Sequence, residues 1–430
     1  MVDVLRVSVV VTMVGMAAVA AVAAADVAPG DTIDKSNVAN AKGLLSPAVE
    51  WCVAQGMSIK VIAPKPIGWP KAYKEATEKY ASQVKLAENG LALNGHVAGA
   101  PFPAIDPGDP KIALKIMWNY EYRPYPGTDD FVEYDFPAET GAVGNGKPME
   151  VERYYWIGES RRLYYNSRLY TEPKPELPNP EGIRFKEVLG PLIAPFDLKG
   201  IGALEYRYID ASKQDDTWLY VPSLRRVRRL STAQRSDALF GQDTDPDSYW
   251  GYNGHIAWSE WRFLGEKEML GILHGEHFPQ KRCAAPADYL MCDSWEKRRM
   301  WVVEGVSKLP QYAYGKRVIF IDKESLVVAY SDIYDRNNEL WKVWIDNHQF
   351  RTRAFPGAPT QYDEEKDFYA GLAMVDMQLM HATYVPHPGD KPPGHEGWYF
   401  NKGAESATQY KPAGAVPDSF TVAKLIEQGQ

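Results

Sequence analysis

The sequence predicts a mainly β fold of the α+β class, in which antiparallel strands form a large sheet, a sandwich or a barrel. From about His96 onward, short runs of β-branched and aromatic residues are separated by Gly, Pro, Asn and Asp. No long helical pattern lies between these runs, which favours antiparallel pairing. The predicted strands cover residues 112–120, 149–157, 163–170, 203–208, 217–221, 226–231, 300–306, 317–322, 327–334 and 340–347.

The chain before this β-rich region is expected to be helical. After a polar linker at residues 26–36, apolar residues occur at loosely helical spacing over 38–52. A second helix is predicted from Trp69 or Pro70 to Leu86, because alanine, tyrosine and valine recur there every four residues between Lys and Glu.

Turn signals and proline content divide the chain into segments. Asn-Gly pairs at 89–90 and 94–95 separate a linker and helical segment, residues 26–94, from a β domain, residues 95–385. Prolines at positions 173, 175, 178 and 180 mark an exposed loop inside that domain. Residues 386–430 are predicted to form a Pro- and Gly-rich tail that is loop-like up to position 417.

Residues 1–25 have the features of a cleavable secretory signal peptide. Arg6 precedes an uncharged apolar run of about sixteen residues, and an alanine-rich stretch with two A-x-A sites follows. We expect cleavage after Ala25 and a periplasmic mature protein, with an uncleaved membrane anchor as the alternative. Beyond this segment no apolar run approaches the roughly eighteen residues of a spanning helix.

Charge and composition narrow the classes of partner. The net charge of −8 and the mean hydropathy of −0.39 argue against a general binder of nucleic acids or of anionic membranes. The chain has 26 Tyr and 13 Trp, which suit either broad amphipathic walls or a large β core.

Two of the three cysteines are spaced for a disulfide. Cys283 and Cys292 lie nine positions apart across a loop that contains Pro286. Because a periplasm permits disulfides, we predict that these two residues pair. Cys52 follows Trp51 in an apolar stretch and is predicted to be a buried free thiol.

Motifs for catalysis or metal binding are missing from the sequence. There is no G-x-S-x-G, C-x-x-C, H-E-x-x-H or phosphate-binding glycine loop, so no catalytic residue and no cofactor are predicted. His274, Glu276 and His277 form a compact cluster, but their spacing matches no zinc motif and we expect an ordinary loop. The acidic pair at 215–216 and the three aspartates at 243, 245 and 247 lack the pattern of a calcium loop and are expected to be solvated turns.

The most distinctive string, DDTWLYVPSLRRVRRLS at residues 215–231, predicts a β-hairpin. Trp218 and Tyr220 share one face of its first strand, and Pro222 ends that strand. The second strand follows directly and is rich in arginine. The hairpin is therefore a candidate site for contact with anions.

The arginines of this hairpin need anionic partners. Alternation places Arg226 and Arg228 on one strand face and Arg225 and Arg229 on the other. We expect Arg226 and Arg228 to brace the sheet through salt bridges to a carboxylate such as Asp243. Arg225 and Arg229 are candidates for binding an anionic ligand head group, and bracing by all of them is the alternative.

Several motifs together resemble the family known as domain of unknown function 1329. They are VAGAPFP at 97–103, APFD at 194–197, the arginine hairpin, YDR at 334–336, LWK at 340–342, and DMQ at 376–378 with His381. These motifs span the chain from about residue 95 to 385. The wider resemblance is to periplasmic lipoprotein carriers and outer-membrane lipoprotein-sorting proteins. Relatives of the sorting type read Gly-Ser-Asp-Phe after the arginines, whereas this chain has GQDTDP at 241–246.

The resemblance implies a strongly curved antiparallel sheet, or an incomplete β-barrel closed by helices, whose concave face holds a lipid or another hydrophobic molecule. It also implies a periplasmic carrier or accessory protein of an envelope transport system, with an inner-membrane exporter and an outer-membrane protein as partners. Candidate lining residues are Trp218, Tyr220, Trp258 and Trp341, whereas Trp261 and Trp344 fall on the faces opposite to Trp258 and Trp341.

Two other function classes stay open. A periplasmic hydrolase or glycan-binding protein would stack sugars on exposed tryptophans beside converging carboxylates. A structural adaptor would bridge envelope partners without a small ligand, and a filled interior would favour it.

Overall fold

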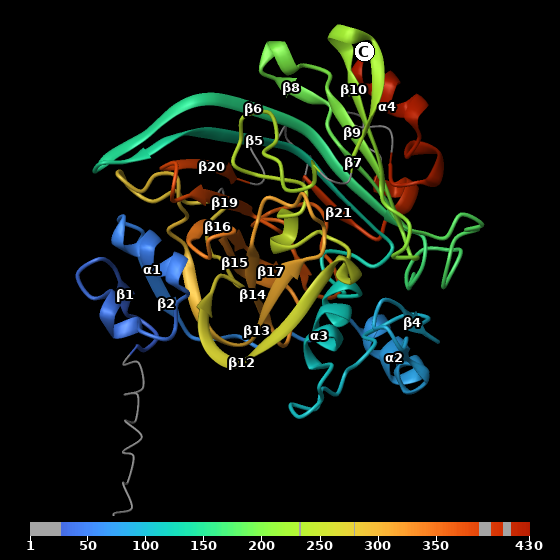
Figure 1. Ribbon diagram of the computed structural model, residues 1–430, viewed down its shortest axis with the longest axis horizontal. Helices are drawn as coiled ribbons and strands as arrows, with labels where there is room; N and C mark the ends of the chain where they lie inside the picture. The colour runs from blue at the N-terminus through green and yellow to red at the C-terminus, as the bar shows by residue number, and fades with distance from the viewer. Residues whose placement is uncertain (1–26, 232–233, 279, 387–396, 407–413) are drawn as a thin grey trace, which may run out of the picture.

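The computed structural model describes residues 27–231, 234–278, 280–386, 397–406 and 414–430. Its main feature is a seventeen-stranded sheet, and the long strands β5 (Asp130–Gly144) and β6 (Lys147–Tyr164) arch over the other strands (Figure 1). The predicted mainly β fold with a strongly curved antiparallel sheet is thereby confirmed. The predicted signal peptide, residues 1–25, lies outside the described residues.

The sheet follows one antiparallel path from edge to edge. In order of pairing, the strands are β11 (Arg226–Leu230), β10 (Asp216–Val221), β9 (Gly202–Tyr208), β7 (Ile183–Leu189), β6, β5, β20 (His381–Pro386), β19 (Gly371–Asp376), β16 (Leu340–Asn347), β15 (Val328–Tyr334), β14 (Lys316–Asp322), β13 (Ser294–Ser307) and β12 (Ser259–Gly271). Within the described residues β11 and β12 do not pair, so the sheet stays open.

Short strands extend this sheet at three places. β8 (Leu192–Ala194) pairs with β6, and β21 (Trp398–Phe400) pairs with β5. β2 (Ile59–Ile62) runs parallel to β13, with β1 (Thr32–Ile33) beside it. The small ladders of β3 (Lys85–Leu86) with β4 (Leu93–Asn94) and of β17 (Phe350–Arg351) with β18 (Lys366–Asp367) lie apart from the sheet.

The α-helices of the described residues are α1 (Pro47–Ala54), α2 (Lys71–Tyr80), α3 (Ile112–Glu121) and α4 (Val422–Gly429). α1 begins at Ser46, whose side chain accepts a hydrogen bond from the Val49 amide at 3.2 Å, and Pro47 occupies the first helical position. α3 packs on β12, and α4 packs on β9 and β10. Among the described residues, no helix is long and apolar enough to cross a membrane.

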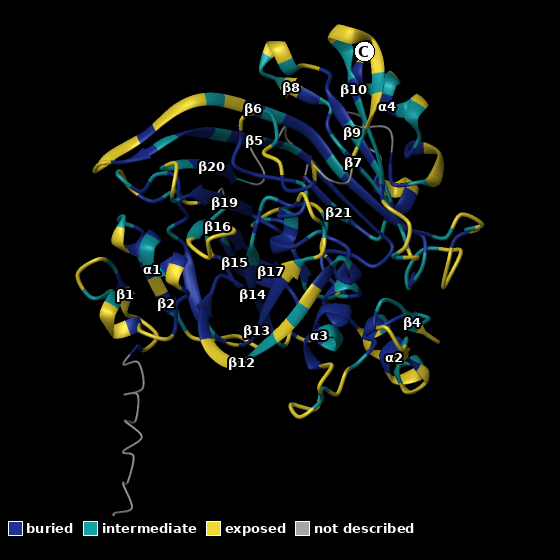
Figure 2. Cartoon of the chain, viewed as in Figure 1, coloured by how far each residue is buried: buried dark blue, intermediate teal, exposed yellow. Residues whose placement is uncertain are grey.

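One connection crosses the open side of the sheet between its two edge strands. We call its residues 234–258, which follow β11 and precede β12, the crossover segment. Trp250 of this segment lies edge-on to Phe131 at 5.2 Å and against Tyr369 at 4.6 Å between ring centroids. These rings belong to a buried aromatic cluster, and Figure 2 shows the corresponding interior as buried. Much of the concave side is therefore filled with side chains.

The prediction of a strand at 112–120 is wrong, because these residues form α3. Ile112, Ile116 and Tyr120 are buried at a spacing of four residues, and the intervening Met117 is buried as well. A short apolar run has no periodicity that separates a buried helix from a buried strand. The buried contacts of α3 with β12 and its neighbours decide in favour of the helix.

Several predicted boundaries also need correction. The helix predicted over 38–52 is a 3-10 turn at Val38–Ala41 followed by α1, because Pro47 has no amide hydrogen to continue a preceding helix. The helix predicted up to residue 86 ends at Tyr80. The strand predicted at 149–157 is part of β6, which ends at Tyr164. The strand predicted at 163–170 is therefore wrong beyond residue 164, where the amides of residues 169–171 donate to the carboxylate of Asp129 instead of to a neighbouring strand.

The strands β5, β7, β12, β19 and β20 were not predicted. β12 shows why, because Gly265 and the charged run Glu266, Lys267 and Glu268 interrupt its middle with residues of low β propensity. Pairing with β13 along nearly its whole length outweighs these local preferences. In the tail segment, residues 398–400 form β21, so the loop-like prediction for residues 386–417 is wrong there. Residues 422–429, beyond that loop-like part, form α4.

The predicted disulfide between Cys283 and Cys292 is present, with the two Cα atoms 4.7 Å apart. Cys52 is the free cysteine and is fully buried in α1. Burial raises the pKa of its thiol far above the ordinary value, so that thiol stays protonated and unreactive.

Removal of the disulfide tests its contribution to stability. We expect a Cys283→Ser/Cys292→Ser variant to lose about 2–3 kcal/mol of unfolding free energy, because the bond no longer restricts the unfolded chain. Thiol labelling of native-source protein under denaturing, non-reducing conditions should find Cys52 alone. Labelling of all the cysteines would contradict the prediction.

Candidate ligand pocket

A pocket of about 400 Å³ lies between the inner face of the sheet, at the β6–β11 end, and the crossover segment. Side chains of β7, β9 and β10 on this face form its floor, because residues two apart along a strand point the same way. The apolar lining of the floor and walls consists of Ile157, Leu189, Leu192, Ile201, Ala203, Leu219 and Leu230 from the sheet side and Ala238, Leu239, Phe240 and Tyr249 from the crossover segment.

Charged side chains at the pocket floor neutralise one another. Arg235, of the crossover segment, is 4% exposed and donates to Glu205 Oε2 at 2.7 Å and to Asp215 Oδ2 at 3.0 Å. Its Nε also forms an ion pair with Asp247. A buried guanidinium with three carboxylate partners presents little uncompensated charge to a ligand.

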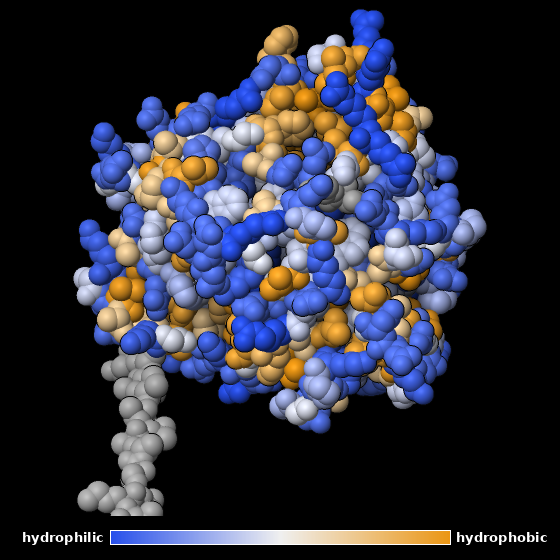
Figure 3. All heavy atoms as spheres, viewed as in Figure 1, coloured by the Kyte–Doolittle hydropathy of each residue, from blue (hydrophilic) through white to orange (hydrophobic). Residues whose placement is uncertain are grey.

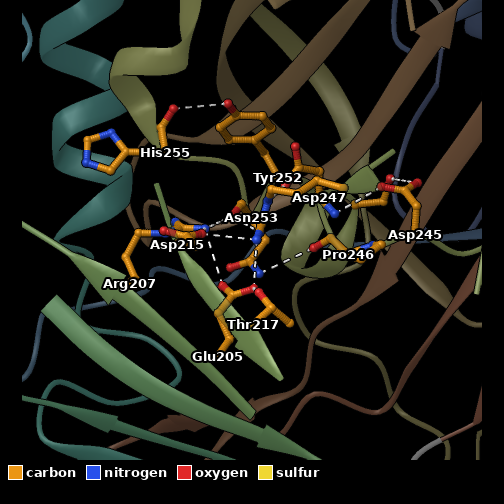
Figure 4. A network of polar contacts seen from close by, with 12 residues as sticks. Glu205, Arg207, Asp215, Thr217, Asp245, Pro246, Asp247, Tyr252, Asn253 and His255 are labelled. Carbon is orange, nitrogen blue, oxygen red and sulfur yellow. Dashed lines mark hydrogen bonds and ion pairs between the residues drawn. The ribbon is translucent and has the colours of Figure 1, made fainter. Parts of the chain in front are cut away.

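Asn253 joins this ion network to the sheet (Figure 4). Its backbone carbonyl accepts hydrogen bonds from Arg207 at 2.8 Å and from Arg235 at 3.2 Å. Its side-chain oxygen accepts one from Arg162 of β6 at 2.9 Å. Arg207 in turn donates to Asp215 at 2.9 Å, so guanidiniums of β6, β9 and the crossover segment meet at one residue.

The pKa shifts in this network follow from burial and from the arginines. Burial raises the pKa of Asp215 to about 6, although Arg207 opposes the shift. Burial would also raise the pKa of Glu205, but Arg235 and Arg207 hold that pKa below its ordinary value. The network therefore keeps at least Glu205 ionised as a partner of the two guanidiniums.

The predicted hairpin is confirmed as β10 and β11, but its aromatic residues do not line the pocket. Trp218 and Tyr220 lie on the outer face of β10 and belong to the cluster beneath α4, which includes Leu425. Thr217 and Leu219, on the other face, line the pocket. The expectation that the Trp-x-Tyr face meets the cavity is corrected, because α4 provides the apolar cover for that face.

The bracing role predicted for Arg226 and Arg228 is not found. Both are exposed and form no ion pair within the described residues. They lie opposite Val221 and Leu219 in the ladder and so share the inner face with the pocket. Arg229 is on the outer face, where it forms an ion pair with Asp216, and Arg225 occupies the turn with a positive φ of 46°.

Asp243 does not bind arginine, contrary to the prediction. It is buried, and both its carboxylate oxygens lie 2.9 Å from His381 Nδ1. Its amide also donates to Thr383 Oγ1 at 2.7 Å. These contacts fasten the crossover segment to β20. The neighbouring Asp245 and Asp247 are buried too, so the solvated turn predicted at 243–247 is wrong.

The other tryptophans considered as lining are packed elsewhere. Trp258 stacks with Arg207 and Arg235, whose guanidinium carbons lie 5.5 and 5.8 Å from its ring centroid. Trp341 donates to Asp376 at 2.8 Å, and Trp344 is fully buried. Trp261 packs against Tyr252. None of these rings borders the pocket.

The histidine cluster shows no metal site. His274 contacts Glu296 at 2.8 Å, and His277 contacts Asp293 at 2.9 Å. Glu276 instead pairs with Lys60 at 3.0 Å. Within the part of the chain that the structure describes, no three His, Cys, Asp or Glu side chains gather as metal ligands.

Sequence reasoning missed Glu205, Arg207, Arg235 and Asn253. Glu205 and Arg207 were available as charges inside a correctly predicted strand, two residues apart and hence on one face. Arg235 and Asn253 lie in a loop, where no periodicity indicates which side chains turn inward. The useful signal was the isolated arginine four residues after the hairpin, close to several carboxylates.

Replacement of Arg235 tests whether this buried arginine contributes more to stability than an exposed one. We expect Arg235→Met to lower the unfolding free energy by about 3–5 kcal/mol, because buried carboxylates lose their partner. The matched control Arg226→Met should change it by less than about 0.5 kcal/mol, since Arg226 is exposed. Equal effects of the two variants in chemical denaturation would contradict this assignment.

The contact between His381 and Asp243 predicts a pH dependence. The hydrogen bond to Asp243 raises the pKa of His381, so its contribution to stability is complete below the unfolded value of about 6.5 and is lost as pH rises through the raised value. The stability difference between the native protein and His381→Gln should therefore shrink towards alkaline pH in denaturant titrations.

Asp243→Asn serves as the control for this dependence. It removes the largest of the charges that raise the pKa of His381, so the pKa of the same histidine should then fall towards its ordinary value, although Glu152 remains 3.6 Å from its Nε2. The stability difference between native protein and His381→Gln could instead prove independent of pH. That result would show that His381 is not protonated in its contact with Asp243.

Comparison with known proteins identifies the family. The family model described as protein of unknown function (DUF1329) matches residues 32–425. The uncharacterized protein PA3922 of Pseudomonas aeruginosa is 26% identical over 361 residues, which cover 80% of this chain and 70% of that protein.

Three solved structures are similar to parts of the chain. A putative outer membrane lipoprotein-sorting protein domain from Vibrio parahaemolyticus has 18% identity and a TM-score of 0.46, covering 73% of this chain and 98% of that one. A DUF1329 family protein from Desulfovibrio piger has 12% identity, a TM-score of 0.41 and coverages of 67% and 88%. The LolA superfamily protein NE2245 from Nitrosomonas europaea has 14% identity, a TM-score of 0.37 and coverages of 65% and 94%. Because the family model spans most of its length, this chain belongs to the DUF1329 family.

Proposed function

We propose that this protein is a periplasmic carrier or accessory protein that holds a lipid or another hydrophobic molecule in the pocket beneath the crossover segment. The observation that carries the proposal is the combination of apolar walls with a floor whose charges are already paired. Such a site favours an apolar ligand, because it offers buried apolar area but few unpaired polar groups.

The dimensions of the pocket support a small ligand. Its volume of about 400 Å³ falls in the range of about 300–1,000 Å³ that is usual for small-molecule sites. Each Å² of apolar surface that leaves water contributes about 25 cal/mol to binding. An acyl chain or a molecule of similar girth would contact both the strand side and the crossover side.

Arg226 and Arg228 are suited to an anionic head group. On the inner face, Arg228 lies opposite the pocket-lining Leu219 and two residues before the pocket-lining Leu230, and Arg226 lies two residues further along the same face. Both arginines are exposed and form no ion pair within the described residues. A carboxylate or phosphate there would form charge-assisted hydrogen bonds with guanidinium groups. The expectation that Arg229 binds the head group is revised, because Arg229 lies on the outer face and forms an ion pair with Asp216 there.

The proposed compartment is supported by the signal-like residues 1–25 and by the Cys283–Cys292 disulfide, which suits an oxidising environment. In the periplasm the protein would receive or deliver its ligand beside an inner-membrane exporter and an outer-membrane protein, the partners that the family resemblance implies.

A structural adaptor is the second candidate, and the filled concave interior favours it. Trp250, Trp344 and Tyr369 occupy much of the space that an open half-barrel would leave for a ligand. A sugar-stacking role has less support, because Trp218, Trp258 and Trp341 are partly buried by other parts of the chain.

Filling the pocket tests the carrier function. Native mass spectrometry with lipid extraction, applied to protein purified from its own periplasm, should detect a bound hydrophobic molecule. We expect Ala203→Phe to remove most of it, because Ala203 lines the floor and an aromatic ring occupies ligand space.

Val151→Phe is the matched control, because Val151 is 48% exposed on β6 and lies outside the pocket. It should retain the ligand in full. Thermal unfolding of both delipidated variants checks that they are folded. Native protein without any extractable ligand, or equal retention by folded Ala203→Phe, would favour the adaptor instead.

A further inference from the structure

Two neighbouring loops expose large apolar side chains above the pocket. Phe196, between β8 and β9, is 93% exposed, and Leu224, in the turn between β10 and β11, is 47% exposed. Ile193 of β8 adds a third exposed side chain at 42%. We call residues 193–200 and 222–229 the apolar tip. Exposed apolar side chains that gather in one patch mark a contact surface, whereas single ones do not.

The two loops of the apolar tip lie against each other at their bases. A Cβ atom on Gly200 would come within 2.8 Å of Pro222 Cγ, so the backbone of one loop touches the ring that starts the other. The φ of +82° at Gly200 also requires glycine there. In Figures 1 and 2 both loops rise as exposed ribbons at the top of the molecule.

The loops arise from strands that line the pocket. Leu192 and Ile201 flank the first loop, whereas Leu219 and Leu230 flank the second. All of these side chains line the pocket. A surface that binds the apolar tip would therefore lie next to the pocket. Figure 3 shows hydrophobic atoms at this end of the molecule, with hydrophilic atoms beyond them.

The charge of these loops is opposite in sign to that of the whole chain. Residues 192–200 and 216–230 together contain five Lys and Arg but two Asp, whereas the net charge of the protein is −8. Arg225, Arg226 and Arg228 form no ion pair among the described residues. Exposed apolar groups surrounded by cations match the layers of an anionic bilayer surface, where phosphates lie above acyl chains.

From this arrangement we infer that the apolar tip docks on membranes rich in anionic phospholipid, with Phe196 and Leu224 entering the interface and the arginines contacting phosphates. The inference rests on the proposed function, because a lipid carrier must reach a membrane to load or release its ligand. It also refines the expectation from net charge, since the acidic chain concentrates cations at one end.

Vesicle sedimentation tests the docking surface. Full-length protein should sediment with phosphatidylcholine vesicles that contain phosphatidylglycerol, and much less with pure phosphatidylcholine. Phe196→Ser/Leu224→Ser should weaken this binding by about tenfold or more, because two buried apolar side chains are lost from the interface. Leu379→Ser is the matched control, since Leu379 is 73% exposed away from the apolar tip.

The cationic contribution is tested separately. Arg225→Gln/Arg226→Gln/Arg228→Gln should weaken binding to anionic vesicles on the order of a hundredfold, and high salt should have a similar effect on the native protein. Unchanged thermal unfolding confirms that both sets of variants are folded. Three results would overturn the inference: equal binding to neutral and anionic vesicles, no binding to either, or an equal loss of binding in Leu379→Ser. The apolar tip would then be a contact surface for a protein partner.

Extractable lipid is measured in the same variants. If the carrier function and the docking surface are both correct, Phe196→Ser/Leu224→Ser keeps its ligand but loses vesicle binding, whereas Ala203→Phe shows the reverse. Vesicle binding by a protein that never contains lipid would disprove the carrier function alone. Lipid retention by a native protein that never binds anionic vesicles would disprove the docking surface alone.

Discussion

The buried ion network around Arg235 is the interaction on which the pocket depends. It fixes the crossover segment, which has little regular structure of its own, to the inner face of β9 through Glu205 and Arg207. Charged residues are unusual in this position, because their burial is unfavourable unless each finds a partner. Here the guanidinium groups of Arg207 and Arg235 have carboxylate partners. The crossover segment is therefore held over the sheet by ion pairs, and apolar side chains need not fill the whole space between them. The space left above the paired charges is the pocket.

Strand alternation explains how one hairpin takes part in two different surfaces. On β10, Trp218 and Tyr220 contribute to the core beneath α4, while Leu219 faces the pocket. On β11 the same alternation separates Arg229, paired with Asp216, from Arg226 and Arg228 on the pocket side. The outer face thus stabilises the fold, and the inner face is free to contact a ligand. A shift of one residue in register would exchange these roles.

The sequence supported the fold class, several strands, the disulfide and the hairpin, because each depends on local pattern or close spacing. It failed where distant residues decide the outcome. Residues 112–120 form α3 because they pack on β12, and β12 is a strand because β13 pairs with it. The same limit applies to the site. Arg226 and Arg228 have the local pattern of braces, but the buried brace is Arg235, whose partners lie on β9 and on the loops beside it.

The position of the pocket at one end of the sheet follows from how the concave side is filled. Over β14 to β19, aromatic residues of the crossover segment and later loops form a dense core around Trp344. At the β6–β11 end, α4 packs on the outer face of β9 and β10. This packing stabilises the strands, so their inner face does not need to be densely packed. The loops that leave these strands carry the exposed side chains of Phe196 and Leu224. A hydrophobic ligand that moved between a membrane and the pocket at this end of the sheet would cross little water. Exposure of its apolar surface to water is the unfavourable step that a carrier has to limit.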